Sequence, residues 1–345
     1  MLTIGKLHIK SPLVLAPLAG ITDLPLRMLN RAFGCELAFT SMISACALAW
    51  SSLKSEKMLY TEAADRPLGV QLLGADADML ARAVDRLAGY PLDLIDFNAA
   101  CPVPKVVRKG EGAGLMKEPK KLAMLLKVLV AHSAVPVTIK IRAGWDNSSR
   151  NARDIARHAQ DAGASAVFIH GRTRAEEYRG RVSYEAIREV KKALSIPVIG
   201  SGDAFSPRLI KKMFDETGCD GVAIARGALG NPWLFRETQE FLAAGTAPDR
   251  PEPYEIIAVM RRHLDQCCVF HGEGLGTKLF SKFFSWYSKG FINIKPLRIR
   301  AFAACSRSEL MAVIDEMATL GMEPGAPVYA SREAEAMEDV CSMEI

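Results

Sequence analysis

The residue types best suited to chemistry occur together in the segment Asp93–Lys105, which reads DLIDFNAACPVPK. The apolar start of this segment predicts a buried strand, and Pro102 ends the strand because proline has no N–H for a central ladder. Asn98 and Cys101 are therefore expected in a loop at the end of the strand, where α/β enzymes usually hold catalytic groups. A thiol with a pKa near ~8.5 is mostly protonated at neutral pH, so Cys101 could act as a general acid as well as a nucleophile. Most cysteines are only small buried hydrophobic residues, but the proline-bounded loop argues against that alternative.

Two glycine-containing loops could bind a phosphate group. Gly200–Asp203 reads GSGD and precedes Ser206 and Pro207, which can open a helix, and Ala225–Gly227 follows the next apolar segment. Glycine lets backbone N–H groups approach a phosphate closely, and helix N-termini attract anions. Either loop alone could be only a tight turn, but the two together favour a cofactor that carries phosphate.

Three further polar residues interrupt or end apolar segments. Lys140 lies in the β-branched run Val137–Arg142, where a lysine either faces solvent at a sheet edge or points to a ligand. A barrel has no edge, so the ligand interpretation is favoured, and a buried ammonium could stabilise the anionic ring of a reduced flavin. Gln71 could equally be a satisfied core amide. His170 could be a core histidine, although the arginines that follow it favour an anion.

A regular alternation of apolar and amphipathic segments must position these residues. Eight short apolar segments occur in order: Leu13–Pro17, Leu37–Ser41, Leu68–Leu72, Leu92–Asn98, Val135–Ile141, Ala166–His170, Pro197–Gly200 and Gly221–Ala225. Amphipathic stretches between them predict helices at Ala77–Leu87, Pro119–Ala131, Asn151–Ala162, Tyr184–Leu194 and Pro207–Thr217. Strands alternating with helices predict a parallel sheet, and eight such units over roughly 240 residues match a (β/α)8 TIM barrel. An open dinucleotide-binding sheet is disfavoured because no Gly-x-Gly-x-x-Gly follows the first strand.

The candidate site residues all lie near the carboxyl ends of these predicted strands. They are Pro17, Leu18, Ala19, Gln71, Asn98, Cys101, Lys140, Arg142, His170, Arg172, Ser201, Gly202, Asp203, Ala225 and Arg226. In a barrel the carboxyl ends share one rim, so residues far apart in sequence would converge there. This convergence predicts a single active site.

The alternation stops after residue 235, and a second part of the chain follows. A proline-rich linker spans 245–253, after which Tyr254–Gly272, Leu275–Lys289 and Ser308–Leu320 predict three helices. The expected α/β fold is therefore a TIM barrel (residues 1–244) followed by a small C-terminal helical-bundle domain (residues 254–320). Residues 321–345 are polar, acidic and unpatterned, which predicts a flexible tail.

Charge is uneven in the C-terminal part. Residues 274–308 contain seven Lys and Arg and no Asp or Glu, whereas residues 309–345 contain nine acidic residues and one Arg. A basic stretch permits contacts with nucleic-acid phosphates, and Phe283, Trp286 and Tyr287 within it could stack on bases. Their helical spacing makes a hydrophobic core the simpler interpretation.

The composition is that of an ordinary globular protein, with 345 residues, a net charge of +5 and a pI of about 8.7. The N-terminus lacks a signal-peptide pattern and the apolar runs are too short to span a bilayer, so a cytoplasmic protein without a membrane partner is expected. The eight cysteines contain no Cys-x-x-Cys pair, which predicts neither a metal site nor a disulfide framework. A monomer is expected by default.

Several motifs in one order resemble the tRNA-dihydrouridine synthase family, from about Leu13 to Phe235 and more weakly to about Leu320. They are Ala16–Asp23 (APLAGITD), Asn98–Pro102 (NAACP) with Lys105, Lys140–Trp145 (KIRAGW), His170–Thr173 (HGRT) with Tyr178 and Gly180, Gly202 with Asp203, and Ala225 and Arg226 with Pro232 and Trp233. The number and order of these motifs make a chance match improbable.

The resemblance implies a barrel that binds FMN, a helical domain that grips tRNA, and reduction of particular uridines to 5,6-dihydrouridine with electrons from NADPH or NADH. It implies FMN contacts for Pro17, Leu18, Ala19, Gln71, Lys140, His170, Ser201, Gly202, Asp203, Ala225 and Arg226. It also implies that Asn98 holds the uracil, with Arg142 and Tyr178 assisting. Hydride would then reach C6 of the uracil, and Cys101 would protonate C5 from the opposite face. The uracil must leave its stack to reach such a pocket, so loop nucleotides are the expected targets.

The sequence departs from the family pattern at three places. The family usually has Asn where Ser201 stands and Gly where Ala100 stands, and it has Arg-Lys-His where Ser281–Phe283 precedes Trp-Tyr. The last change bears on the choice of target uridine more than on catalysis. Two other hypotheses stay open: an FMN barrel acting on a free metabolite, of the dihydroorotate or dihydropyrimidine oxidoreductase type, and a flavin-free RNA-binding or chaperone protein.

Overall fold

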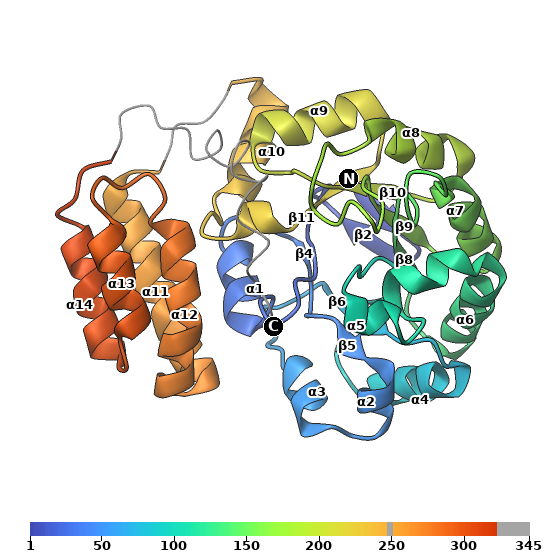
Figure 1. Ribbon diagram of the computed structural model, residues 1–345, viewed down its shortest axis with the longest axis horizontal. Helices are drawn as coiled ribbons and strands as arrows, with labels where there is room; N and C mark the ends of the chain where they lie inside the picture. Colours follow the sequence, from blue (N-terminus) through green and yellow to red (C-terminus); the bar gives the residue numbers. More distant parts are fainter. Residues whose placement is uncertain (247–250, 323–345) are drawn as a thin grey trace.

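The computed structural model describes residues 1–246 and 251–322 and confirms the predicted barrel. Eight parallel strands form its wall: β3 (Leu13–Leu15), β4 (Leu37–Phe39), β6 (Leu68–Leu73), β7 (Leu94–Asn98), β8 (Val137–Arg142), β9 (Ala166–His170), β10 (Val198–Ser201) and β11 (Gly221–Ile224). The sheet closes because β11 pairs with β3 and β4 pairs with β6. A two-residue strand, β5 (Ile43–Ser44), adds a short pairing to β6. Figure 1 shows the helices as a ring around these strands.

The outer layer contains the helices that connect the strands. They are α1 (Leu24–Arg31), α2 (Ala45–Ala49), α3 (Leu53–Met58), α4 (Ala77–Leu87), α5 (Pro104–Val107), α6 (Pro119–His132), α7 (Ala152–Asp161), α8 (Tyr184–Ala193), α9 (Pro207–Thr217) and α10 (Leu234–Ala244), with 3-10 turns η1 (Gly112–Lys117) and η2 (Arg226–Ala228). The five helices predicted by amphipathic spacing are α4, α6, α7, α8 and α9, correct to within one residue at each end. Side-chain caps explain two of the starts, because Ser183 and Ser206 each accept a hydrogen bond from the third helical N–H.

Side-chain alternation along each strand divides the apolar residues between two cores. Ile95 and Phe97 of β7 face outward and belong to the layer between strands and helices. Leu94 of the same strand faces inward, where the rings of Phe39 and Phe168 meet edge to face at 5.5 Å. The barrel interior is therefore a packed core and not a pore.

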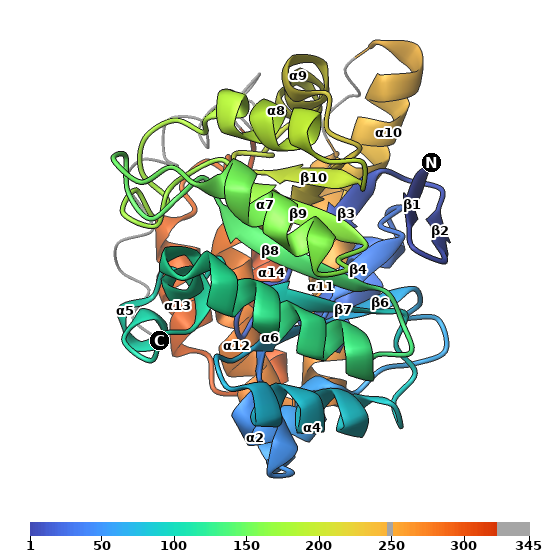
Figure 2. The same cartoon turned by 90° about the vertical axis from the view of Figure 1, so that its right-hand side faces the viewer.

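The amino end of the barrel is closed by a hairpin that the sequence pattern had not indicated. The strands β1 (Leu2–Ile4) and β2 (Leu7–Ile9) are antiparallel and only three residues each, too short for a clear pattern. Leu2, Ile4 and Ile9 are buried in the same core as the inward side chains of the barrel. Figure 2 shows the hairpin beside the amino ends of the strands.

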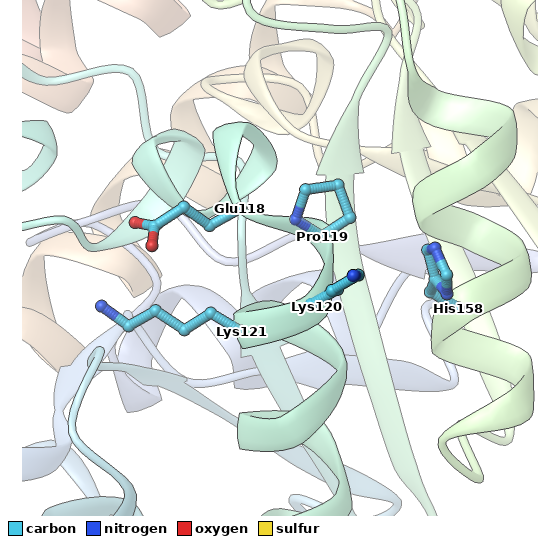
Figure 3. A pocket seen from close by; sticks show the side chains of 5 residues that line it. All are labelled: Glu118, Pro119, Lys120, Lys121 and His158. Atoms are coloured by element: carbon cyan, nitrogen blue, oxygen red, sulfur yellow. The ribbon is translucent and has the colours of Figure 1, made fainter.

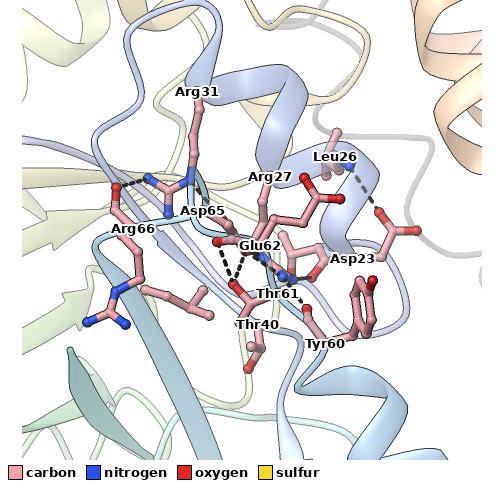
Figure 4. A network of polar contacts seen from close by, with 12 residues as sticks. Asp23, Leu26, Arg27, Arg31, Thr40, Tyr60, Thr61, Glu62, Asp65 and Arg66 are labelled. Atoms are coloured by element: carbon pink, nitrogen blue, oxygen red, sulfur yellow. Dashed lines mark hydrogen bonds and ion pairs between the residues drawn. The ribbon is translucent and has the colours of Figure 1, made fainter. Parts of the chain in front are cut away.

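A buried ionic network ties α1 to the loop that leads into β6 (Figure 4). The Asp65 carboxylate accepts hydrogen bonds from the Nε atoms of Arg27 and Arg31, each at 2.8 Å, and from the Thr61 hydroxyl. Arg27 also donates to the backbone carbonyl of Tyr60 at 3.0 Å, and both Arg27 and Asp65 are almost fully buried. Because both arginines share one carboxylate and also bind backbone oxygens, the network fixes this loop relative to α1.

Four helices follow the barrel within the described residues, where the sequence predicted three. They are α11 (Pro253–His271), α12 (Glu273–Tyr287), α13 (Lys295–Ala303) and α14 (Arg307–Met317). The prediction missed α13 because only Leu297 and Ala301 of its nine residues are buried, so its exposed basic residues hid the helical pattern. The expectation of a core for the aromatic residues of α12 is confirmed, since Phe283 and Tyr287 are buried.

The C-terminal helices share their core with the barrel domain. Leu26 and Leu29 of α1, and Trp233 before α10, belong to the same apolar cluster as α11 and α12. The Asp23 carboxylate caps α1 and lies 2.7 Å from the imidazole Nε2 of His271 at the end of α11. Figure 1 shows α11 and α12 as the bundle helices closest to α1. This apolar contact positions the bundle against one side of the barrel.

Parts of the predicted linker and tail lie outside the described residues. Residues 247–250 fall within the linker, and residues 323–345 make up almost all of the predicted acidic tail. Across residues 1–246 and 251–322, we find no helix long and apolar enough to cross a membrane.

Candidate active site at the carboxyl ends of the barrel strands

The structure places the residues singled out in the sequence at or just after the carboxyl ends of the strands, except for Gln71 and Lys140, which lie two residues before the ends of β6 and β8. Buried members are Gln71, Asn98, Cys101, Arg142, His170 and Ser201, and partly exposed members are Pro17, Leu18, Ala19, Lys140, Gly202, Asp203, Ala225 and Arg226. Tyr178, from the loop after β9, is the most exposed at 37%. The barrel closure therefore brings together residues that are up to about two hundred positions apart in sequence.

Strand register aligns three polar side chains in one layer across neighbouring strands. Gln71 of β6 pairs with Asp96 of β7, which pairs with Thr138 of β8. The Asp96 carboxylate accepts a hydrogen bond from Gln71 Nε2 and another from the Thr138 hydroxyl, both at 2.7 Å. All three residues are almost fully buried, so this layer is a satisfied polar network within the barrel.

The next turn of the pleat carries Asn98, whose side chain is fully engaged by the protein. Its Oδ1 accepts hydrogen bonds from the backbone N–H groups of Ala100 and Cys101, at 3.0 and 2.9 Å. Its Nδ2 donates to Gln71 Oε1 at 2.7 Å. Asn98 therefore holds the loop that carries the thiol, a task that the sequence did not reveal.

The Cys101 thiol is 9% exposed and is protonated at neutral pH. Burial raises its pKa above the ordinary value, while a backbone N–H at Val103 and the charge of Arg142 oppose that rise in part. The backbone carbonyl of Cys101 accepts from the N–H of Ala113, which anchors the loop to η1. A Cβ at Gly112 would lie 2.8 Å from that carbonyl oxygen, so only glycine permits this approach.

The charges of Lys140 and Asp96 interact in the barrel interior. Burial lowers the pKa of Lys140 to about 8 and raises that of Asp96 to about 6, and each residue's charge opposes the shift in the other. Near pH 7 both groups are therefore charged. No hydrogen bond to the Lys140 ammonium is found within the described parts of the chain, so its donors are available to a ligand.

His170, at the end of β9, is neutral. Burial, reinforced by the charges of Arg142, Lys140 and other nearby arginines, lowers the pKa of its imidazole well below the ordinary value. Its Nε2 is buried and has no hydrogen-bond partner among the described residues. A buried ring nitrogen without a partner is costly, and a bound ligand at the rim would satisfy it.

Arg142 joins two loops of the rim. Its Nε donates to the carbonyl of Ala100 at 2.7 Å, and its Nη1 donates to the carbonyls of Thr173 and Glu177 at 2.9 and 2.8 Å. Its guanidinium also lies over the Tyr178 ring, 5.6 Å from the centroid. Arg142 therefore couples the Cys101 loop to the loop after β9.

Asp203 lies between two arginines in the predicted phosphate region. Arg172 donates to both carboxylate oxygens of Asp203, at 2.9 and 2.6 Å, and Arg226 lies 3.4 Å from one of them. The Arg226 guanidinium is also 5.1 Å from the centroid of Tyr178. The two arginines give this part of the rim a positive charge that Asp203 only partly offsets.

Some predicted residues do not contact the others directly. Leu18 donates its N–H to the hydroxyl of Thr22 at 3.0 Å and accepts from Ser41, so the loop after β3 is held by its own neighbours. No hydrogen bond among the described residues links Pro17, Leu18 or Ala19 to the rest of the site. Their proximity to Ala225 follows only from the pairing of β3 with β11.

The sequence analysis assigned no role to Asp96. A signal was present, because a carboxylate two residues before Asn98 in a strand faces the same side as Asn98. Arg172 was placed at the rim, but its bidentate contact with Asp203 depends on how the loops fold and could not be predicted.

A surface recess of about 520 Å³ lies elsewhere, between the start of α6 and the face of α7 (Figure 3). It is lined by Glu118, Pro119, Lys120, Lys121 and His158. None of the residues predicted for the site lines this recess, and its open, basic surface lacks convergent polar groups. The rim of the barrel therefore remains the candidate active site.

The fold and the rim define a (β/α)8 barrel enzyme with its polar residues at the carboxyl ends of the strands. The family model for dihydrouridine synthases matches residues 14–320. The chain is 39% identical over 285 residues to tRNA-dihydrouridine synthase B of Pseudomonas aeruginosa, covering 82% of this chain and 86% of the relative. It is 38% identical over 286 residues to tRNA-dihydrouridine synthase B of Vibrio parahaemolyticus, covering 83% and 89%. The chain belongs to the tRNA-dihydrouridine synthase family.

A solved structure with a similar fold is the 6-hydroxypseudooxynicotine amine oxidase of Pseudomonas geniculata. Its TM-score is 0.53 at 14% identity, and the match covers 71% of this chain and 48% of that one. At this identity the similarity supports the barrel fold alone.

Proposed function

We propose that the protein reduces uridines of tRNA to 5,6-dihydrouridine at the barrel rim, with FMN as cofactor and NADPH or NADH as reductant. Family membership supports dihydrouridine synthesis, and the tRNA substrate is taken from the names of the relatives. The observation that carries the proposed chemistry is the Cys101 thiol, which burial keeps protonated on a loop at the same rim as the loops after β10 and β11.

The chain's own residues fit FMN. The unpartnered Nε2 of His170 and the free ammonium of Lys140 face a region in which Arg226 supplies positive charge for a phosphate. A Cβ at Gly202 would lie 3.0 Å from His170 Cδ2, so glycine keeps that loop close to the imidazole. Residues that would hold the cofactor are Pro17, Leu18, Ala19, Gln71, Lys140, His170, Ser201, Gly202, Asp203, Ala225 and Arg226. Bound FMN, reduced by NADPH or NADH, would supply the hydride that reaches C6 of the uracil.

Cys101 would supply the proton at C5 of the uracil. Its raised pKa keeps the proton on sulfur at neutral pH, and the positive charge of Arg142 would stabilise the thiolate that remains after transfer. A proton from solvent would later restore the thiol. The rate should therefore fall at alkaline pH, first as Lys140, with a pKa of about 8, loses its charge and then as the thiol ionises.

Asn98 would orient the uracil with the Nδ2 hydrogen that otherwise makes only a weak contact with Met42 Sδ, at 3.7 Å. Its oxygen is engaged by two backbone N–H groups, and one Nδ2 hydrogen is donated to Gln71. Tyr178, lying between the guanidinium groups of Arg142 and Arg226, would provide an aromatic face at the entrance. The base must be flipped or unpaired to reach these groups.

The basic surface for tRNA would come from the C-terminal helices. The acid-free stretch 274–308 covers most of α12 and all of α13, the helix that the sequence analysis missed. Phe283 and Tyr287 are core residues and are not available for stacking, whereas Phe302 of α13 is 58% exposed. Binding through Lys and Arg to phosphates predicts affinity that falls steeply with salt.

The decisive experiment is dihydrouridine mapping in tRNA from cells with and without this gene, and with the gene carrying Cys101→Ala. We expect one or more uridines to lose the modification in the deletion strain and not to regain it with Cys101→Ala. Cys46→Ala changes an exposed cysteine outside the barrel rim and is the matched control, which should restore the modification. An unchanged uridine profile in the deletion strain would refute the proposal.

Purified protein separates the two other hypotheses. A yellow preparation with flavin absorbance argues against a flavin-free RNA-binding protein. Turnover of a free dihydropyrimidine or of dihydroorotate without RNA, at the rate seen with tRNA, would support the metabolite oxidoreductase instead.

A further inference from the structure

The backbone of the Cys101 loop fixes the direction of a chain of hydrogen bonds. The N–H groups of Ala100 and Cys101 can only donate, so Asn98 must present its oxygen to both of them. The amide group of Asn98 is thereby oriented, and its Nδ2 must point the other way. This orientation follows from backbone donors and leaves no choice of amide flip.

The same constraint on donors and acceptors fixes the orientation of Gln71, the next residue of the chain of hydrogen bonds. Asn98 Nδ2 can only donate, so the Gln71 side chain must present its oxygen, and it does so at 2.7 Å. Gln71 Nε2 then faces away from Asn98 and needs an acceptor. The Asp96 carboxylate fills that need at 2.7 Å.

A carboxylate suits the last position of this hydrogen-bond chain, where Gln71 Nε2 needs an acceptor, better than other side chains. It accepts and does not donate, so it cannot pair with Gln71 in the reverse direction. Its second oxygen is occupied by the Thr138 hydroxyl, which fixes the rotation of the carboxylate plane. Asp96 is 1% exposed, so water cannot replace it as an acceptor.

We propose that Asp96 is a positioning residue for Cys101: its carboxylate sets the direction of a hydrogen-bond chain that holds the thiol loop in place. The inference deepens the proposed function, since it assumes that the Cys101 thiol is the reacting group. It assigns Gln71 a part in holding this loop, in addition to its predicted contact with FMN.

The test uses the alkylation rate of Cys101 in the full-length protein as purified. Iodoacetamide is added, and the Cys101 peptide is quantified by mass spectrometry against the exposed Cys46 of the same sample. Asp96→Leu removes the acceptor, and Gln71→Leu interrupts the chain at its middle. Each variant should release the loop and raise the alkylation of Cys101 at least tenfold relative to Cys46.

The double variant Asp96→Leu with Gln71→Leu tests whether the two residues act through one chain. It should react no faster than the faster single variant, because a broken chain cannot be broken again. Multiplied effects of the two substitutions would show that they act independently, and would overturn the proposal.

Asp96→Asn separates hydrogen bonding from charge. Its amide oxygen can accept from Gln71 while its amide nitrogen donates to the Thr138 hydroxyl, so the chain is preserved and the negative charge is lost. Alkylation of Cys101 should stay within twofold of the unmodified protein. An increase equal to that of Asp96→Leu would mean that the charge and not the hydrogen bond matters, and would contradict the proposal.

A matched control is Thr40→Val, which removes a buried hydroxyl at the end of β4 whose one hydrogen bond within the described part of the chain goes to the carbonyl of Ser41. It should leave Cys101 alkylation unchanged, which excludes general loosening of the rim. Circular dichroism confirms folding of each variant. If Asp96→Leu fails to fold, Gln71→Leu alone still tests the proposal. An unchanged alkylation rate of Cys101 in that variant would refute the hydrogen-bond chain.

The rate of uridine reduction in tRNA is a second, independent measurement on the same variants. Asp96→Leu should lower kcat at least tenfold while the KM for tRNA changes less than threefold, and Asp96→Asn should recover most of the loss. The alkylation experiment involves no uridine reduction, so it can succeed or fail independently of the proposed function. An unchanged kcat in Asp96→Leu together with unchanged alkylation would end the inference.

Discussion

The two ends of the barrel interior are built from the same strands, but one end is an apolar core and the other carries the polar groups of the candidate site. At the amino end, Leu37 and Leu94, the first residues of β4 and β7, belong to the same closed apolar core as the hairpin residues. At the carboxyl end the inward positions are polar or charged, as Asp96 and Lys140 show. Along one strand, the inward-facing residue therefore changes from apolar to polar within two to four positions, as from Leu94 to Asp96 and Asn98 in β7.

Burial has opposite consequences at these two ends. At the amino end it removes apolar surface from water and stabilises the fold. At the carboxyl end it shifts the pKa of Asp96, Lys140 and Cys101, because a buried site disfavours the charged form. A substitution should therefore reduce stability at one end and alter protonation or reactivity at the other.

The largest effect is expected from Phe39→Ala in the apolar core of the barrel interior. The ring is 1% exposed and packs edge to face on Phe168, and Gly69 has no side chain with which to fill the space. Removing a buried aromatic ring typically costs about 3–5 kcal/mol of unfolding free energy. Urea denaturation should show this loss, while the alkylation of Cys101 in the folded protein stays unchanged. A loss below about 1 kcal/mol would contradict the view of the apolar barrel interior as a tightly packed core.

A buried titratable residue far from the rim tests whether burial alone shifts a pKa. Burial lowers the pKa of His263, in the aromatic core of the helical bundle, to about 4, although the Asp23 charge opposes the shift. The unfolded chain, with a histidine pKa near 6.5, binds more protons between pH 6.5 and 4, so stability falls as the pH falls through that range. The loss should reach about 3 kcal/mol at pH 4.

His263→Gln removes this titration and keeps a polar side chain that can pair with the Tyr287 hydroxyl. Thermal melts at pH 7 and pH 4.5 should show a smaller acid-induced fall in Tm for the variant than for the unmodified protein. Equal falls would mean that His263 is not held neutral by burial.

An effect of similar size to that of His263, but opposite in its pH dependence, is expected from Asp96→Asn at the carboxyl end. Burial raises the pKa of Asp96 to about 6 even with Lys140 nearby. The folded protein therefore binds more protons than the unfolded chain between pH 3.8 and 6, and stability declines as the pH rises through that window. Above pH 6 the ionised carboxylate costs up to about 3 kcal/mol, which asparagine would recover.

Tm values at pH 7 and pH 4 check this prediction. The variant should be more stable than the unmodified protein at pH 7, and the two should approach each other near pH 4, where Asp96 is protonated in the folded protein and partly protonated in the unfolded chain. A less stable variant at pH 7 would mean that the carboxylate stabilises the fold, and it would remove the contrast between the two ends of the barrel. A gain in stability without a gain in turnover would agree with a buried charge retained for function.

The sequence predicted the barrel well because its signals were local. All eight apolar segments became strands, and five amphipathic stretches became helices at the expected positions. The hairpin β1–β2 and the helix α13 were missed for a related reason: each has too few buried residues to produce a clear period. Their structure depends on contacts with distant parts of the chain.

The sequence predicted which residues lie at the site, but not the hydrogen bonds that they form with one another. The sequence placed Asn98 and Cys101 at the end of a strand, but it did not reveal that the amide of Asn98 holds the backbone of the thiol loop. The family resemblance implied that Arg142 assists the substrate, which stays a prediction, but no sequence pattern revealed that its guanidinium also joins two loops of the rim through backbone carbonyls. Hydrogen bonds between loops depend on the geometry of the closed barrel, which no local pattern encodes.

By itself the sequence determined the alternation of strands and helices, the inward and outward faces of each strand, and the polar residues at the strand ends. Those features follow from side-chain periodicity and from the inability of proline to continue a strand. Only the tertiary structure decided that Gln71, Asp96 and Thr138 form one layer, because strand register is set when the sheet closes. The same closure removed these groups from water, and that loss of solvent gave the thiol, the ammonium and the carboxylate their shifted pKa values.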